Sequence, residues 1–238
     1  MWEGVAMFRF KRFLIDDSLC AMKVGTDGVL LGAWADVEGD CRLLDVGSGS
    51  GIITLMLAQR NAAAHVTAID IDAGAVEATR RNAEASPWGE RITYSRCDVV
   101  DYKPDTLFDH IISNPPYFER SLLSPDAQRS VARHTASLSF EALVTAACRL
   151  LNQGGRLSVI LPREGAAHLR RIAFGRLWLR RLTDVVTREG DAPCRTLMEF
   201  ERCARPLMPR CDVMAIEDGK GEYTEEYRRL TEDFYLKF

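Results

Sequence analysis

The sequence predicts an α/β fold in which helices cover both faces of a largely parallel sheet. Short apolar runs alternate with stretches of helical spacing along most of the 238 residues, and this alternation is typical of parallel strands joined by helices. The composition is 47% hydrophobic, which is enough for one domain with a full core. We therefore expect ligands to bind at the carboxyl ends of the strands of this single domain.

The predicted elements follow one another with short connections. Strands are expected at 42–46, 65–70, 91–97, 107–113 and 156–161, and helices at 28–35, 51–60, 73–86, 139–152 and 163–174. Asp72 is expected to cap the helix that follows it, because its side chain can accept a free backbone N–H. The run Asn152-Gln153-Gly154-Gly155 is a helix stop signal.

Two more features close the predicted fold. The runs 177–187 and 196–204 are expected to form a hairpin-like pair at the end of the sheet. The acidic tail carries apolar residues at helical spacing (Tyr223, Tyr227, Leu230, Phe234), so we expect a helix there that docks on the domain.

A glycine-rich turn follows the first predicted strand of the core. Asp45-Val46-Gly47-Ser48-Gly49-Ser50-Gly51 leads into the helix at 51–60, and glycines let the backbone turn sharply and approach a ligand closely. The spacing is not that of a dinucleotide-binding turn, because Ile52 occupies the place of the last glycine. Asp70, at the tip of the next strand, can accept both hydroxyls of a ribose. Asp98 follows a third strand and is a candidate acceptor for an adenine amine.

Asn114-Pro115-Pro116-Tyr117 follows the predicted strand at 107–113. The two prolines lack an N–H and have a fixed φ, so the turn is stiff. The Asn114 side-chain oxygen and the Pro115 carbonyl can accept the two N–H groups of an amine or amide, while the group's plane stacks on Tyr117. A proline-rich turn after a buried strand explains the tetrapeptide alone equally well; the glycine turn upstream favours a binding site.

The series of strand tips resembles the class I methyltransferases that use S-adenosylmethionine and methylate an exocyclic or amide nitrogen. The segment Cys20 to Trp34, with Phe8 to Phe13 before it and Arg133-His134 after Tyr117, resembles the bacterial tRNA adenine-N6 methyltransferases, which modify the adenosine beside the anticodon of a valine tRNA. The resemblance extends from about Phe8 to about Pro206. It implies a Rossmann-like class I methyltransferase fold with a mostly parallel seven-stranded sheet and S-adenosylmethionine as the cofactor.

The motifs and the resemblance together give a set of expected site residues. The catalytic residues are expected to be Asn114, Pro115, Pro116 and Tyr117. The cofactor is expected to meet Thr26, Asp27, Asp45, Gly47, Ser48, Gly49, Gly51, Asp70, Ile71, Asp98 and Asn114. The substrate is expected to meet Tyr117, Arg133, His134 and Arg163, and no metal is expected. The roles of Thr26 and Asp27 rest on the resemblance, because from the residues alone Gly25 to Gly28 is a turn that could cap a helix. From the residues alone the favoured interpretation of His134 is a surface histidine, with a phosphate or substrate contact as the alternative, while His65, His110 and His168 are expected to be structural.

The resemblance also divides the single methyltransferase domain at 1–238 into three parts. Residues 1–40 form an N-terminal extension on the side of the cofactor and substrate, 41–205 the Rossmann-like core, and 206–238 an acidic tail with a helix. We expect a monomer or a weak homo-oligomer.

Cysteine usage and the termini predict a cytoplasmic protein. The seven cysteines are scattered and include no C-x-x-C pair, which argues against a disulfide framework or a zinc site. The first residues are too charged for a signal peptide, and no run approaches the ~20 apolar residues of a membrane span.

The charge of the chain neither excludes nor establishes an RNA partner. The formal net charge is −3, but residues 163–211 hold eleven arginines against six acids, while 212–238 hold eight acids and four bases. Clustered arginine can bind phosphates despite an acidic total. A solvated surface rich in salt bridges explains the same counts, so tRNA as a partner rests on the motifs.

Three other functions compete with tRNA adenine methylation. Enzymes that methylate a glutamine amide in translation release factors share Asn-Pro-Pro-Tyr, but they carry a helical domain ahead of the fold, and only about forty residues precede the first strand here. Ribosomal RNA guanine-N2 methyltransferases share the tetrapeptide shape, but many carry a second copy of the domain. A non-catalytic domain that binds the cofactor or RNA is disfavoured by the intact glycines, Asp70 and Asn114.

Overall fold

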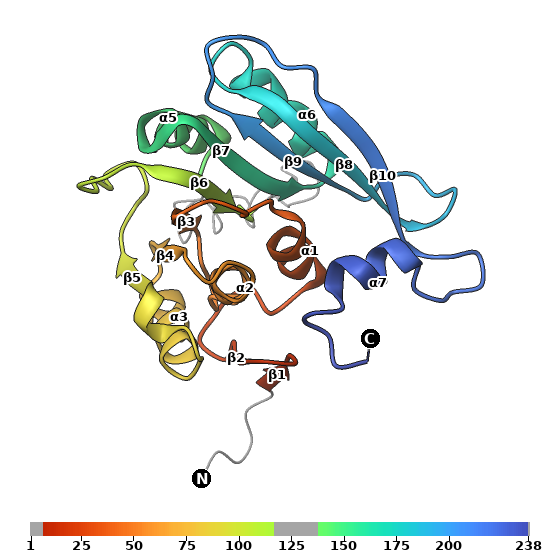
Figure 1. The fold of residues 1–238 in the computed structure, drawn as a ribbon, viewed down its shortest axis with the longest axis horizontal. Coiled ribbons are helices and arrows are strands. Elements are labelled where there is room, and N and C mark those ends of the chain that lie inside the picture. Colours follow the sequence, from red (N-terminus) through yellow and green to blue (C-terminus); the bar gives the residue numbers. More distant parts are fainter. Residues whose placement is uncertain (1–6, 117–137, 238) are drawn as a thin grey trace, which may run out of the picture.

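An eight-stranded sheet forms the centre of the protein (Figure 1). The computed structural model describes residues 7–116 and 138–237. The strand order is β10-β8-β9-β7-β6-β3-β4-β5. The strands are β3 (Arg42–Val46), β4 (His65–Asp70), β5 (Ile92–Arg96), β6 (Phe108–Ser113), β7 (Leu151–Leu161), β8 (Trp178–Arg188), β9 (Arg195–Glu201) and β10 (Arg210–Glu217). Only β9 runs antiparallel to its neighbours. The α/β class and the mostly parallel sheet are therefore confirmed.

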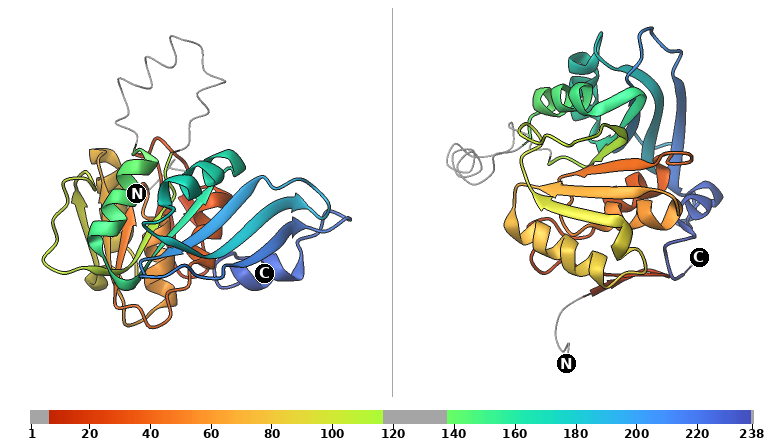
Figure 2. Two further views of the ribbon diagram at one scale, coloured as in Figure 1. Left: turned by 90° about the horizontal axis from the view of Figure 1, so that it is seen from above. Right: turned by 60° about the vertical axis from the view of Figure 1, so that its left-hand side comes forward.

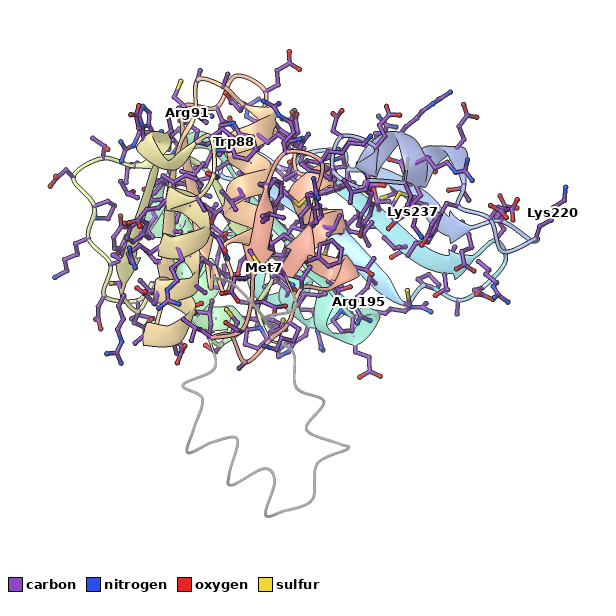
Figure 3. The ribbon with its side chains drawn as sticks, turned by 90° about the horizontal axis from the view of Figure 1, so that it is seen from below. Met7, Trp88, Arg91, Arg195, Lys220 and Lys237 are labelled. Carbon is purple, nitrogen blue, oxygen red and sulfur yellow. The ribbon has the colours of Figure 1, made fainter. Side chains whose placement is uncertain are left out.

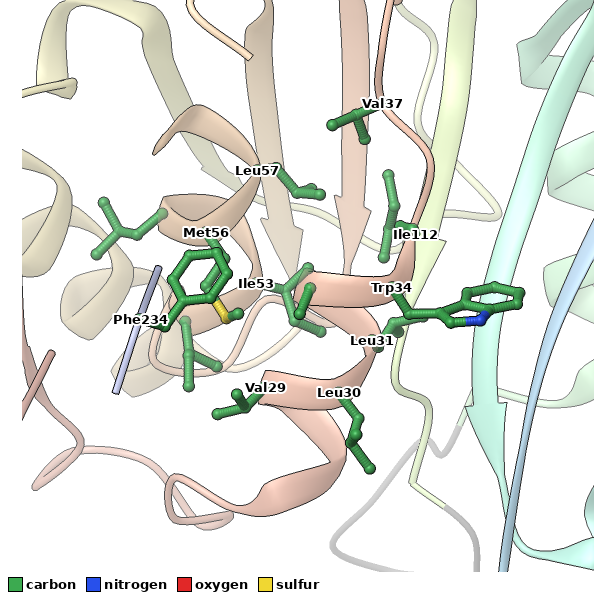
Figure 4. Close-up of a cluster of buried hydrophobic side chains, with 14 of the residues drawn as sticks. Val29, Leu30, Leu31, Trp34, Val37, Ile53, Met56, Leu57, Ile112 and Phe234 are labelled. Atoms are coloured by element: carbon green, nitrogen blue, oxygen red, sulfur yellow. The ribbon is translucent and has the colours of Figure 1, made fainter. Parts of the chain in front are cut away.

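Helices cover both faces of this sheet (Figure 2). They are α1 (Thr26–Trp34), α2 (Ile52–Arg60), α3 (Ala73–Glu84), α5 (Phe140–Leu150), α6 (Arg163–Ala173) and α7 (Glu225–Thr231), with a 3-10 turn at Gly89–Arg91. One core cluster joins α1, α2, α7 and the end of α3 to the sheet, and a second joins α5 and α6 to the other face. Figure 4 shows the first cluster, in which Leu31, Ile53 and Met56 pack between α1, α2 and the strands.

Most of the predicted elements occur within a few residues of their expected bounds. The Asp72 side chain accepts from the Ala75 N–H at 2.8 Å and caps α3, as predicted. The hairpin-like pair is confirmed, because β8 and β9 pair antiparallel. Helix α5 ends at Leu150, and β7 begins at once, so this strand starts before the predicted position 156.

Two parts of the fold differ from the sequence-based expectation. The predicted count of seven strands is one too few, because β10 lies in what was expected to be the acidic tail and pairs with β8 at the edge of the sheet. The sequence of β10 has four consecutive apolar residues from Val213 to Ile216 and no clear alternation of apolar and polar residues, and of the strand's residues only Met214 is buried. A small antiparallel hairpin, β1 (Met7–Arg9) and β2 (Leu14–Asp16), precedes α1. The tail helix docks as expected, burying Tyr227 against the same core as α1.

Within residues 7–116 and 138–237, no helix is long and apolar enough to cross a membrane. The same residues contain no group of three or more His, Cys, Asp or Glu side chains that could hold a metal ion.

Candidate active site

The polar strand tips predicted from the sequence lie together at one edge of the sheet. Strands β6, β3, β4 and β5 are adjacent and parallel, so their carboxyl ends meet at the same edge (Figure 1). In this order the edge carries Asn114, the glycine turn, Asp70 and Asp98. The four motifs therefore form one continuous site.

The glycine turn is held in shape by bonds to β4 and leaves space above itself. The N–H groups of Gly47 and Ser48 both donate to the carbonyl of Ile69, at 2.9 and 3.2 Å. Gly47 and Gly49 have φ values of +75° and +55°, which favour glycine. A Cβ at either position would meet no atom within 4 Å, so a ligand can approach the backbone here.

Ser48 and Gly51 support the turn from inside. The Ser48 hydroxyl is buried and lies 3.0 Å from the Thr79 hydroxyl, which donates to the Gly49 carbonyl at 3.0 Å. Gly51 has a φ of +78°, and a Cβ there would come within 3.2 Å of Thr79. The side chain of Ser48 thus faces α3 and not the open space above Gly47 and Gly49.

Asp70 is oriented by two backbone N–H groups. Its Oδ2 accepts from the Gly49 N–H at 3.0 Å, and its Oδ1 accepts from the Asp72 N–H at 2.9 Å. The carboxylate is only partly buried, and each oxygen keeps a second acceptor site. Ile71 follows with 39% of its surface exposed. Asp98 is exposed, and its Oδ1 accepts from the Val100 N–H at 2.9 Å.

Asp45 does not face the open edge, which corrects its expected role as a cofactor contact. Its side chain is fully buried, and its Oδ2 accepts from the Thr54 hydroxyl at 2.6 Å and the Thr54 N–H at 3.1 Å. Successive strand residues point to opposite faces, and at position 45 this direction leads to α2. Among the described residues, no partner reaches Asp45 Oδ1. Burial raises the pKa of Asp45 to about 7, against the opposing effect of the Thr54 bonds.

This raised pKa predicts how stability depends on pH. An unfolded aspartic acid ionises near pH 4, whereas folded Asp45 holds its proton up to about pH 7. The folded state therefore binds more protons across this interval, and the free energy of unfolding should fall by up to about 4 kcal/mol as the pH rises through it. Urea denaturation across this pH range should show that Asp45→Asn lacks this fall. If the free energy of unfolding changed with pH in the same way in the wild type and in Asp45→Asn, the raised pKa of Asp45 would be contradicted.

Asn114 is fixed beside the glycine turn by the residue before it. The buried Ser113 hydroxyl donates to the Val46 carbonyl at 2.8 Å, which joins the end of β6 to the end of β3. Asn114 and Pro116 are partly buried and Pro115 is buried. Tyr117, Arg133 and His134 lie outside the described residues.

The N-terminus of α1 contacts the other side of the glycine turn. A Cβ on Gly28 would lie 3.2 Å from Ile52, the first residue of α2. The helix begins at Thr26, two residues earlier than predicted, and Gly25 provides no side-chain cap. Thr26 and Asp27 therefore lie in its first turn at this edge. Asp27 Oδ2 accepts from Arg195 Nε at 2.7 Å.

Sequence reasoning missed Arg195. It starts β9, and because β9 runs antiparallel, this residue is at the same edge as the carboxyl ends of the other strands. Arg195 is 168 residues from Asp27 in the sequence, and no local pattern could have paired them. Arg163, the first residue of α6, is exposed and follows the end of β7 at this edge.

A buried Ser-His-Asp arrangement elsewhere in the protein is structural. His110 lies 2.8 Å from the Ser158 hydroxyl through Nε2 and 3.1 Å from Asp40 through Nδ1. Ser158 and His110 are both 0% exposed, so no substrate can reach the hydroxyl. The expected structural role of His110 fits this burial.

The sheet and its edge are those of the class I methyltransferases. A predicted O-methyltransferase from Agrobacterium tumefaciens superposes with a TM-score of 0.69 at 25% identity, covering 87% of this chain and 96% of that one. The N-methyltransferase NodS from Bradyrhizobium japonicum, solved with S-adenosyl-L-homocysteine, has a TM-score of 0.51 at 17% identity over 73% of this chain and 83% of its own, which supports the fold alone.

A family model described as the methyltransferase small domain matches residues 25–176. Proteins from Phocaeicola vulgatus and Porphyromonas gingivalis, both named tRNA1(Val) (adenine(37)-N6)-methyltransferase, are each 46% identical over 96% of this chain and over 97% and 94% of their own lengths. The chain therefore belongs to the methyltransferase small domain family, among relatives of that name. The resemblance of the sequence to the bacterial tRNA adenine-N6 methyltransferases is confirmed.

Proposed function

We propose that the protein transfers a methyl group from S-adenosylmethionine to the exocyclic N6 of an adenine in tRNA. The relatives are named for adenine 37 of a valine tRNA, and we infer the same substrate here. The observation that carries the proposal is the bond from the Ser113 hydroxyl to the Val46 carbonyl, which holds Asn114 beside the glycine turn. Reaction at this edge would take place in the cytoplasm, where tRNA is found.

The described residues fit the cofactor. The space above Gly47 and Gly49 lets a ligand approach the turn, and the fixed carboxylate of Asp70 can accept ribose hydroxyls beside it. Asp98 lies on the next strand tip, where an adenine amine would reach it. The bound cofactor supplies an electrophilic methyl group on a sulfonium.

Asn114 and Pro115 would position and activate the target amine. The nitrogen lone pair of an adenine amine is delocalised into the ring, which makes it a poor nucleophile. Acceptance of its two protons by Asn114 Oδ1 and the Pro115 carbonyl would favour a tetrahedral nitrogen. The same oxygens would stabilise the positive charge that develops on that nitrogen. Fixed geometry of the two reactants can lower the barrier by roughly 7–11 kcal/mol, and no strong general base is needed because the charged methylated amine loses its proton readily.

A labelling experiment separates this function from methylation of a glutamine amide. We would incubate the protein with methyl-labelled cofactor and either total tRNA or translation release factors, digest each, and identify the labelled product. Label should appear in N6-methyladenosine from tRNA and be lost in Tyr117→Ala, since the ring is expected to stack on a base extruded from the anticodon loop. Label confined to protein would promote the glutamine alternative.

A further inference from the structure

The structure separates the arginines of residues 163–211 into two groups. Seven of the eleven hold partners: Arg176 with Glu141, Arg180 with Glu201, Arg181 with the Trp34 carbonyl, Arg188 with Glu217, Arg195 with Asp27, Arg202 with the Leu151 carbonyl and Arg210 with Asp212. Within the described part of the chain, no hydrogen bond or ion pair holds the other four guanidinium groups, which belong to Arg163, Arg170, Arg171 and Arg205. Three of these four lie on α6.

The outward face of α6 combines this charge with an exposed ring. The helix buries Ala166, Leu169 and Ala173 against the sheet, so the arginines point away from the core. Arg170 and Arg171 precede Phe174 by four and three residues, and these spacings bring side chains onto one face of a helix. Phe174, directly after the helix, is 77% exposed and contacts the Trp178 ring edge-on at 5.8 Å. We call Arg163, Arg170, Arg171 and Phe174 the α6 face.

The α6 face begins at the active-site edge, on the side away from the cofactor residues. Strand β7 lies next to β6, which is followed by Asn114. The glycine turn, Asp70 and Asp98 follow β3, β4 and β5, on the other side of β6 (Figure 1). Arg163 starts α6 immediately after Pro162 at the end of β7. From there the eleven residues of α6 extend for about 16 Å. A substrate with its reacting base at Asn114 can therefore continue along this helix.

The far edge of the sheet, beyond β7 at β8 and β10, carries acidic groups. A groove between the β8–β9 turn and α7 is lined by Glu189, Asp191, Glu225 and Glu226. Phosphates are repelled there, whereas the α6 helix has three arginines against one exposed acid, Glu164. This asymmetry favours one orientation of a polyanion on the protein.

We propose that the α6 face binds the RNA next to the target base, with Arg163, Arg170 and Arg171 contacting phosphates and Phe174 stacking on an unpaired base. This inference rests on the proposed function and names the surface that holds its substrate. Unpaired arginines bind phosphates and release counterions, and aromatic rings among basic residues bind unpaired bases regardless of sequence. The surface supplies affinity and orientation and takes no part in methyl transfer.

The test is the charge reversal Arg170→Glu/Arg171→Glu, compared with the matched reversal Lys220→Glu/Lys237→Glu. The control lysines are exposed and lie near α7 and the loop before it (Figure 3). We expect the α6 variant to raise the KM for tRNA by about 10–100-fold, and to flatten the dependence of log KM on log salt by about 1.4, or about 0.7 for each lost phosphate contact. The kcat at saturating tRNA and the affinity for S-adenosylmethionine should not change. The control should match the wild type in all four measurements.

Phe174→Ala tests the ring separately. Because the ring is 77% exposed, the melting temperature should stay near that of the wild type, while tRNA affinity falls about tenfold, as loss of one stacked base requires. If the wild type methylates tRNA and both α6 variants match the control in KM and salt dependence, the proposal that the α6 face binds RNA is overturned and the proposed function stands. If the wild type transfers no methyl group to tRNA, the proposed function fails and this inference fails with it.

Discussion

Asn114→Ala should lower the rate of methyl transfer by a factor of at least about 10² while it retains cofactor binding, because Asn114 serves turnover more than cofactor affinity. Its side-chain oxygen matters most as positive charge develops on the amine, so its loss affects the transition state more than the bound substrates. The side chain lies at the end of β6, which the Ser113–Val46 bond holds in place, and its removal leaves this support intact. Single-turnover kinetics at saturating tRNA and calorimetry with the cofactor measure the two quantities separately.

Asn114→Asp is the matched variant, because it keeps an acceptor oxygen of the same reach. It should retain more activity than Asn114→Ala. Near-normal turnover in the alanine variant would remove Asn114 from the mechanism.

Asp70→Ala should weaken S-adenosylmethionine binding by about 1.5–3 kcal/mol, the range for hydrogen bonds to a charged group. The carboxylate is expected to accept the ribose hydroxyls, and it also receives the Gly49 N–H, so its loss removes a ligand contact and loosens the turn. Isothermal titration calorimetry measures the change.

Asp72→Ala is the control for this prediction. Asp72 caps α3 through the Ala75 N–H, so its replacement should cost about 0.5–2 kcal/mol of stability and leave cofactor affinity near that of the wild type. Equal losses of affinity in the two variants would show that Asp70 acts through local stability and not through a ligand contact.

The edge of the sheet that carries the candidate active site could be predicted from the sequence, because a parallel sheet brings the carboxyl ends of its strands together. Once the apolar runs were assigned as strands, the glycine turn, Asp70, Asp98 and Asn114 had to meet at one edge, and the structure places them there. Asp72 as a helix cap followed equally from local chemistry.

The direction of the Asp45 side chain could also be predicted from the sequence, by the alternation of side chains along a strand. Its place beside the glycine turn indicated a ligand contact instead. Asp45 alternates with Leu44 and Val46, whose side chains pack in the core on the α5 and α6 side, so it had to point to the other face of the sheet. The expectation that Asp45 contacts the cofactor followed its position beside the glycines and did not take this alternation into account.

Contacts between distant segments could not be predicted from one sequence. Nothing near Asp27 indicates that Arg195 pairs with it, because the antiparallel direction of β9 creates the contact. The same limit applies to the arginines, since their number was evident but their salt bridges depend on tertiary packing.

The most direct test is mass-spectrometric nucleoside analysis of purified valine tRNA from cells with the gene, without it, and with the deletion complemented by the wild type or by Asn114→Ala. We expect N6-methyladenosine at position 37 in wild-type cells, its loss on deletion, and its return with the wild-type gene but not with Asn114→Ala. Unchanged N6-methyladenosine in the deletion strain would contradict the assignment of this protein as the tRNA adenine-N6 methyltransferase.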